Sequence, residues 1–306
     1  MMSSIKFYIV DVFAQEKYSG NQLAVFVDLE QLLTAEEMLR ITKEINFAES
    51  TFIRSREEDG SFGVRIFTTE YEVPFAGHPT LGTAYILAKH LLGQPKEELV
   101  LRLKKGDIHV RIECPDQLEK SRFTMQQAQP DFGNTYTVTD VALALDLSTE
   151  ALDATMPLQE VSTGLPYLII FLKDLKTIRQ LQLNDKKLEA FLFEHKLHKT
   201  NSPCSLSTSF FFVTKETVGA ENHYHSRMFA LEDGKLCEDA ATGSANGCLL
   251  AYLLKYENES VSATVEQGYE MGRKSLLYLN GQVSNELYTL TVGGRVFSIS
   301  EGLWSI

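Results

Sequence analysis

The chain of 306 residues is poor in several residue types, and each shortage excludes a class of protein. It contains one tryptophan and only four cysteines, Cys114, Cys204, Cys237 and Cys248. No Cys-x-x-Cys pair occurs, so we interpret these cysteines as reduced thiols, as expected in the cytoplasm. No run of about 18 apolar residues is present, which argues against a transmembrane helix. The first residues lead directly into a predicted strand, so we expect no signal peptide.

Basic residues are also scarce relative to acidic ones. The chain has 29 lysines and arginines against 41 acids, and its net charge is −12. This balance argues against a nucleic-acid partner and against binding to an anionic membrane. The seven histidines form no familiar metal-binding spacing, and we interpret the close pair His223 and His225 as part of a surface loop or strand. An anionic small-molecule substrate would therefore have to be held by local features, without a metal.

The most informative stretch is the small-residue segment from Asp239 to Gly247, which an apolar run over 248–254 follows. This order predicts the start of a buried helix with Asp239 as its N-cap residue. Gly243 and Ser244 would leave the first backbone N–H groups open to an anion, because small side chains do not cover them.

A second segment, His78 to Ala84, matches Asp239 to Ala245 position by position. The match pairs His78 with Asp239 and Gly82 with Gly243. Because both segments precede apolar helices, the match predicts two similar halves.

Predicted elements before the two helix starts repeat in one order. In the first half we expect strands over 5–13, 23–27, 47–53 and 62–68, with a helix from the capping box Thr34-Ala35-Glu36-Glu37 to about Glu44. In the second half we expect strands over 167–171, 209–213 and 227–229, with a helix over about 184–195. The predicted fold is α+β, with two pseudo-symmetric domains, each a mostly antiparallel sheet curled around a central helix. We place the domains at 1–127 and 128–287.

The two halves differ at Glu49, whose counterpart in the second half falls near Ser207. Within its predicted strand Glu49 shares a face with Phe47 and Thr51, so partial desolvation should raise its pKa. The plain alternative is a glutamate that faces water at a sheet edge. His78 and Asp239 could likewise be ordinary caps, or His78 a core histidine. Taken together, the three residues suit proton transfer on an anionic small molecule.

Three segments resemble the PhzF-like isomerases of phenazine biosynthesis: Asn46-Phe47-Ala48-Glu49-Ser50, Phe75-Ala76-Gly77-His78-Pro79-Thr80-Leu81-Gly82-Thr83 and Asp239-Ala240-Ala241-Thr242-Gly243-Ser244-Ala245. A fourth, from Gln267 to Arg273, is similar to the late Gln-Gly-x-x-x-Gly-Arg motif of that family. The resemblance extends from about Ile5 to Gly302. It implies the diaminopimelate-epimerase fold, with the active site in a cleft and the last strand or two, about 288–306, returning to the first domain.

The resemblance also implies an activity. The best-known family member isomerises the small carboxylate trans-2,3-dihydro-3-hydroxyanthranilate without metal or organic cofactor, and a glutamate carries a proton between two carbons. By motif match that glutamate is Glu49. His78, Asp239 and Ser244 match residues that surround the substrate, and Gly77 and Gly243 would allow close backbone approach.

Two departures and two alternatives accompany this prediction. Gln22 and Ala240 stand where the family usually has proline, and the second change lies beside a predicted site residue. One alternative is an amino-acid epimerase or racemase with a cysteine at each helix start, but the aligned positions lack cysteine. The other is a non-catalytic binding protein of the same fold. The sequence leaves open the physiological substrate and the choice between a single chain and a homodimer.

Overall fold

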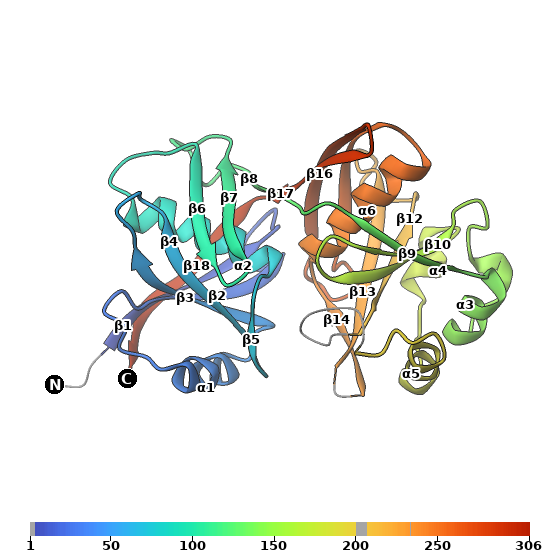
Figure 1. Cartoon of the computed structure of the whole chain (residues 1–306), viewed down its shortest axis with the longest axis horizontal. Coiled ribbons are helices and arrows are strands. Elements are labelled where there is room, and N and C mark those ends of the chain that lie inside the picture. Colours follow the sequence, from blue (N-terminus) through green and yellow to red (C-terminus); the bar gives the residue numbers. More distant parts are fainter. Residues whose placement is uncertain (1–3, 200–206, 233) are drawn as a thin grey trace. The chain divides into compact units, whose positions relative to one another are not determined.

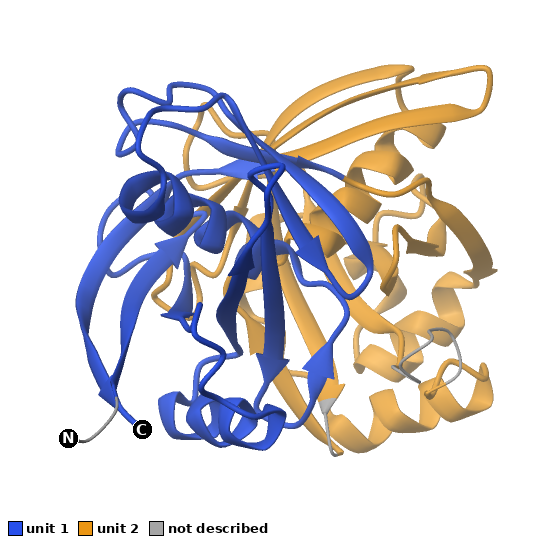
Figure 2. Cartoon of the chain, turned by 60° about the vertical axis from the view of Figure 1, so that its left-hand side comes forward, with its two compact units in different colours: residues 1–126, 293–306 blue, residues 127–292 orange. Residues whose placement is uncertain are grey.

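The computed structural model describes residues 4–199, 207–232 and 234–306, so Cys204 lies outside the described residues. The chain forms two compact units, residues 1–126 with 293–306, and residues 127–292 (Figures 1 and 2). Within the described ranges, no helix is both long enough and apolar enough to cross a membrane.

The first unit is a curved sheet packed on one central helix. Its helices are α1 (Ala35–Ile45) and α2 (Gly77–Ile86), which runs on into a π-helical turn (Leu87–Leu91). Its strands are β1 (Ser4–Val12), β2 (Asn21–Val27), β3 (Glu49–Arg56), β4 (Phe62–Thr68), β5 (Glu72–Val73), β6 (Glu98–Leu103), β7 (Gly106–Ile112), β8 (Phe123–Gln126) and β18 (Val296–Ser305). β18, β1 and β2 pair antiparallel, β2 and β3 parallel, β3 and β4 antiparallel, β4 and β6 parallel, and β6, β7 and β8 antiparallel.

The second unit repeats this plan. Its helices are α3 (Val138–Leu145), α4 (Leu175–Arg179), α5 (Asp185–Glu194) and α6 (Gly243–Tyr256), with a 3-10 turn at Thr149–Ala151. Its strands are β9 (Asp131–Tyr136), β10 (Leu158–Ser162), β11 (Pro166–Phe171), β12 (Ser209–Thr214), β13 (Tyr224–Glu232), β14 (Lys235–Asp239), β15 (Ser260–Gln267), β16 (Ser275–Ser284) and β17 (Leu287–Gly294). β9, β10 and β11 pair antiparallel, β11 and β12 parallel, β12 and β13 antiparallel, β13 and β15 parallel, and β15 and β16 antiparallel.

The shared order of pairings confirms the predicted α+β fold with two pseudo-symmetric parts. Every residue of α2 is buried, and so are residues 243–254 of α6. A helix that is apolar all round needs cover on every side, which a sheet curled around it supplies. Each parallel strand pair is joined by a crossover that contains helix. In the first unit α1 joins β2 to β3 and α2 joins β4 to β6; in the second, α4 with α5 joins β11 to β12 and α6 joins β13 to β15.

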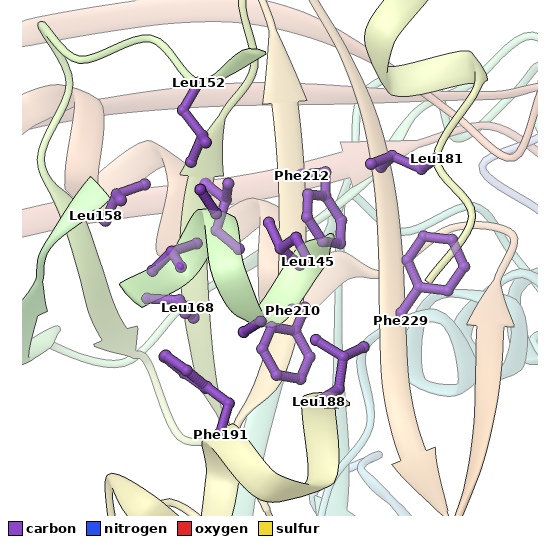
Figure 3. Packing of buried hydrophobic residues seen from close by; sticks show 14 of the residues in the cluster. Leu145, Leu152, Leu158, Leu168, Leu181, Leu188, Phe191, Phe210, Phe212 and Phe229 are labelled. Atoms are coloured by element: carbon purple, nitrogen blue, oxygen red, sulfur yellow. The ribbon is translucent and has the colours of Figure 1, made fainter. Parts of the chain in front are cut away.

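The helices other than α2 and α6 build a second apolar layer on the opposite face of each sheet. In the first unit α1 buries Met38 and Ile41 against Phe26 and Phe52. The predicted capping box is confirmed, because Thr34 and the N3 residue of α1 exchange reciprocal bonds. In the second unit, side chains of α3 and α5 pack onto β11 and β12 (Figure 3).

The register of the repeat differs from the sequence match. α2 begins at Gly77 and α6 at Gly243, so the structure pairs these two glycines rather than Gly82 with Gly243. The second residues of the two helices are His78 and Ser244, and the prediction that pairs His78 with Asp239 is wrong. Small residues fill both segments, and a shifted match of one onto the other is therefore easy to obtain.

A second observation supports the corrected register. Thr80 Oγ1 donates to the carbonyl oxygen of Ala76 at 2.7 Å. Asn246 Nδ2 donates to the carbonyl oxygen of Thr242 at 3.0 Å. Ala76 and Thr242 are the N-cap residues of α2 and α6, so the same local bond recurs at the same helical position.

Candidate functional site

Glu49 and His78 lie side by side in the first unit. Glu49 is the first residue of β3, and His78 is the second residue of α2. Glu49 Oε2 is 3.6 Å from His78 Nε2, and their side chains are 19% and 6% exposed. The carboxylate is thus mostly shielded from water yet still reachable, which suits a group that exchanges protons with a substrate.

His78 is a neutral imidazole. Burial lowers the pKa of His78 to about 3 and outweighs a hydrogen bond to the Gln22 backbone, which raises it. Its Nδ1 lies 3.3 Å from Asn21 Nδ2. Among the described residues, its Nε2 has no hydrogen-bond partner. One ring nitrogen that faces Glu49 is therefore left to interact with a bound molecule.

The surroundings of Glu49 differ in part from the prediction. β3 begins at Glu49, so Phe47 precedes the strand and packs instead on the apolar cluster under α1. Thr51 lies on the side of α2, where its Oγ1 is 2.8 Å from Thr83 Oγ1. The prediction that Glu49 and Phe47 share a strand face is wrong, because the chain enters the strand only after Phe47.

Strand register also identifies the counterpart of Glu49. Thr51 pairs with Ile66, and Phe211 pairs with Met228. Ile66 and Met228 are equivalent, because each also pairs with the last residue of the strand that leads into the central helix. Thr51 and Phe211 are therefore equivalent as well. Glu49 lies two residues before Thr51, and Ser209 lies two residues before Phe211, so the counterpart of Glu49 is Ser209, not Ser207. The second unit therefore has no acid at this position.

Both central helices begin without a side-chain cap. Each of the other four described α-helices begins with an N-cap side chain that accepts a hydrogen bond from a backbone N–H group; these N-cap residues are Thr34, Thr137, Asp174 and Asn184. The first backbone N–H groups of α2 and α6 are thus left for another acceptor, and the helix dipole favours an anion there. The predicted binding residues Gly77, Gly243 and Ser244 occupy these first turns.

Asp239 is not an N-cap residue, contrary to the sequence-based prediction. It ends β14, and the N-cap of α6 is Thr242. Thr242 Oγ1 donates to Asp239 Oδ2 across the turn. Ser244 is the second residue of α6, and its Oγ is 2.6 Å from the hydroxyl of Tyr167. The second unit thus gathers Asp239, Gly243 and Ser244 within one short turn.

Sequence reasoning missed the burial of His225. This residue is fully buried on β13, with Nδ1 2.8 Å from Glu266 and Nε2 3.2 Å from Glu270. The interpretation of His225 as a surface residue is wrong, whereas His223 is exposed. Within the described residues, no group of three His, Cys, Asp or Glu side chains has an arrangement suited to a metal ion.

None of the three cysteines within the described residues lies in the first turn of α2 or α6. Cys114 and Cys237 are exposed, and Cys248 is buried in α6. Burial raises the pKa of the Cys248 thiol to about 12, against weaker opposing hydrogen bonds with Thr163. A thiol that stays protonated at neutral pH is a poor base and a poor nucleophile.

The chain is similar to known proteins over nearly its whole length. The family model described as phenazine biosynthesis-like protein (PhzC-PhzF) matches residues 10–302. The trans-2,3-dihydro-3-hydroxyanthranilate isomerase of Pseudomonas aeruginosa is 31% identical over 300 residues, which cover 97% of this chain and 98% of that protein.

Solved structures show the same fold. A PhzF-family phenazine biosynthesis protein of Bacillus anthracis superposes with a TM-score of 0.87 and 26% identity over the full length of both chains. A hydroxyproline epimerase of Agrobacterium vitis, 12% identical, superposes with a TM-score of 0.63 over 100% of this chain and 94% of its own, and shares the fold alone. The length of the matches and their agreement with the fold show that this chain belongs to the phenazine biosynthesis-like (PhzC-PhzF) family and is an isomerase.

Proposed function

We propose that this isomerase moves a proton between two carbons of a small carboxylate and shifts a double bond in doing so, with Glu49 as the proton carrier. The observation that carries the proposal is the pairing of the partly shielded Glu49 carboxylate with a neutral imidazole, Oε2 to Nε2 at 3.6 Å. Glu49 can act as a base beside this uncharged ring, and the imidazole can form a hydrogen bond with Glu49 or with the substrate.

The step balances without a further reactant. The Glu49 carboxylate takes a proton from one substrate carbon, the electron pair of that C–H bond shifts the double bond, and Glu49 returns the proton to another carbon. The substrate and product therefore have the same mass. An enol product would convert to its ketone by a further proton shift.

The remaining predicted residues are proposed to bind the substrate. The uncapped N–H groups at Gly77 and at Gly243 suit a carboxylate, which the net charge of −12 would otherwise repel. Asp239 and Ser244 would bind polar groups of a substrate. The substrate named for the Pseudomonas relative, trans-2,3-dihydro-3-hydroxyanthranilate, is our first candidate. We also propose a cytoplasmic location, and action as a single chain or a homodimer without a cofactor.

Racemisation by two thiols has less support. The helix-start positions hold His78 and Ser244 rather than cysteine, and Cys248 is a buried thiol with a raised pKa. A two-acid racemase would need a second acid, and at the position of the second unit that is equivalent to Glu49 the register places Ser209.

The test is to incubate the purified protein with trans-2,3-dihydro-3-hydroxyanthranilate and to follow substrate and product by NMR and mass spectrometry, with and without a chelator. We expect a new double-bond position at unchanged mass in both samples. If the compound remains unchanged while a chiral hydroxyproline is epimerised, the racemase alternative is correct. If neither reacts, mass spectrometry of small carboxylates that co-purify with the protein identifies the next candidate.

A further inference from the structure

We propose that Gln267 is a positioning residue, which through Thr242 fixes the Asp239 carboxylate and keeps the start of α6 uncapped. The inference rests on the proposed function for its kinetic consequence, but its geometry can be tested without a substrate. Gln267 is the last residue of β15, and its side chain is fully buried. The proposed proton transfer does not use Gln267 directly.

All four hydrogen-bonding positions of the Gln267 amide are occupied. Its Nε2 donates to the carbonyl oxygen of Asp239 at 3.0 Å and to Thr242 Oγ1 at 3.0 Å. Its Oε1 accepts from the backbone N–H of Thr242 and from Asn246 Nδ2, both at 3.1 Å. A backbone N–H only donates and a carbonyl only accepts, so these partners allow a single orientation of the amide.

That orientation sets the direction of the next bond. Because Thr242 Oγ1 accepts from Gln267, its own hydrogen is directed to Asp239 Oδ2. The hydroxyl is thereby withdrawn from the usual role of an N-cap threonine, which accepts from the first helical N–H groups. One relay thus holds the Asp239 carboxylate and leaves the first turn of α6 open.

The first unit shows that the fold does not need this relay. In β4 and β6, Phe62 pairs with Leu101, and in the matching β13 and β15, Tyr224 pairs with Val265. Gln267 lies two residues after Val265, and Leu103 lies two residues after Leu101, so Leu103 is the counterpart of Gln267. The counterpart of Thr242 is the N-cap residue Ala76. The same architecture forms with an apolar pair at these positions, so the polar pair serves the unit that carries Asp239.

The backbone around Gln267 is held rigidly enough for this role. Ser275 Oγ donates to the Ala240 carbonyl oxygen at 2.9 Å, at the residue that replaces the usual proline of the family. Gly268 follows with φ +75°, and a Cβ there would lie 2.4 Å from the same oxygen. The turn after Asp239 and the end of β15 are therefore fixed against each other on both sides of the relay.

The test uses three variants and two measurements. Thr242→Val removes the hydroxyl at nearly constant shape, Thr242→Ser keeps it, and Gln267→Leu introduces the residue type of the first unit. In crystal structures, we expect Asp239 to keep its rotamer in the Ser variant and to lose it in the Val and Leu variants. An unchanged Asp239 rotamer in both the Val and Leu variants would overturn the proposal, whether or not any substrate is known.

The kinetic arm uses trans-2,3-dihydro-3-hydroxyanthranilate. Misplacement by about 1 Å costs up to roughly 100-fold in rate, so we expect kcat to fall about 10- to 100-fold in Thr242→Val and Gln267→Leu. Thr242→Ser should restore most of the activity, which a purely steric role for residue 242 does not predict. A wild-type kcat in Gln267→Leu despite a displaced Asp239 would overturn the proposal. If the wild-type protein itself does not react, the proposed function fails and the crystallographic result alone decides.

Discussion

Glu49 Oε2 and His78 Nε2 face each other at 3.6 Å, just beyond a normal hydrogen bond. Glu49 comes from the start of a strand and His78 from the start of the central helix, so the sheet and helix packing of the first unit sets their separation. Because the imidazole is neutral, the contact between Glu49 and His78 is not an ion pair. Proton transfer at Glu49 therefore breaks no salt bridge with this histidine.

The first prediction concerns Glu49 itself. Glu49→Gln keeps the shape of the side chain and removes the base, so turnover of the isomerase substrate should fall roughly 100- to 10,000-fold. The exposed Glu44→Gln on α1 is the matched control and should retain wild-type turnover. Wild-type turnover in Glu49→Gln, measured by the same NMR assay, would remove Glu49 from the proposed role.

A second prediction follows from the neutral state of His78. Its pKa is about 3 in the folded protein against an ordinary value of 6.5. Between these two values the unfolded chain binds a proton that the folded chain does not, so stability falls as pH falls, by up to about 1.4 kcal/mol per pH unit. In urea unfolding, His78→Gln should lose less stability than the wild type between pH 7 and pH 4.5. His109→Gln, which changes an exposed histidine of the same unit, should behave like the wild type; equal losses in all three proteins would contradict this prediction.

How much of the structure can be predicted from the sequence depends on how far apart in the chain the interacting residues lie. The capping box of α1 involves residues three positions apart, and the sequence alone predicted it correctly. The two uncapped helix starts were found as small-residue segments, but their register was missed because such segments match each other at several offsets. The strand pairings and the capping pattern at Ala76 and Thr242 set that register, and only the folded chain shows them.

Burial by residues that are distant in the chain could not be predicted from the sequence either. His225 has its partners Glu266 and Glu270 41 and 45 residues later in the chain. Nothing local distinguishes His225 from the exposed His223. Gln267 lies in the motif that the family resemblance marked, yet its link to Thr242 spans 25 residues and appears only in the structure.

A third prediction tests that buried cluster. Burial lowers the pKa of His225, but hydrogen bonds to Glu266 and Glu270 outweigh it and raise the pKa above its ordinary 6.5. A raised histidine pKa contributes stability that is fully present below about pH 6.5 and is lost as pH rises through the folded value. Glu266, although buried, has a pKa of about 2 because of bonds from His225, Val218, Gly219 and Asn222, so its carboxylate stays charged throughout this range.

The measurement is the free energy of unfolding at pH 6 and at pH 9. His225→Gln should destabilise the protein more at pH 6 than at pH 9, while the exposed His223→Gln should have little effect at either pH. Other charged groups near the cluster, Arg179 beside Glu270 and Arg227, keep their charge over this interval and leave the sign unchanged. Equal destabilisation at both pH values would show that His225 does not carry a proton in the folded state.

A fourth prediction concerns anions at the central helices. Crystals grown in sulfate or citrate should show anion density within hydrogen-bond distance of the backbone N–H groups at the start of α2 or α6, because no side chain caps them. The capped start of α1, where Thr34 already occupies these donors, is the internal control and should remain without an anion. Density confined to other surfaces would contradict an anion-binding role for these helix starts.

The last prediction separates an isomerase from a racemase. A single carboxylate removes a proton from one face of a substrate and can return it only to that same face. The register matches Glu49 with Ser209, so the second unit has no acid at the position equivalent to Glu49. We therefore expect a substrate deuterated at the abstracted carbon, converted in ordinary water, to yield product with deuterium at the new carbon. Because the Glu49 side chain is 19% exposed, exchange with water should compete, and the retained fraction should be partial and highest in single-turnover samples. Mass spectrometry measures the retained deuterium, and NMR locates it. Complete exchange together with inversion of one stereocentre and no double-bond shift would instead require two acids on opposite faces, and would identify the protein as a racemase.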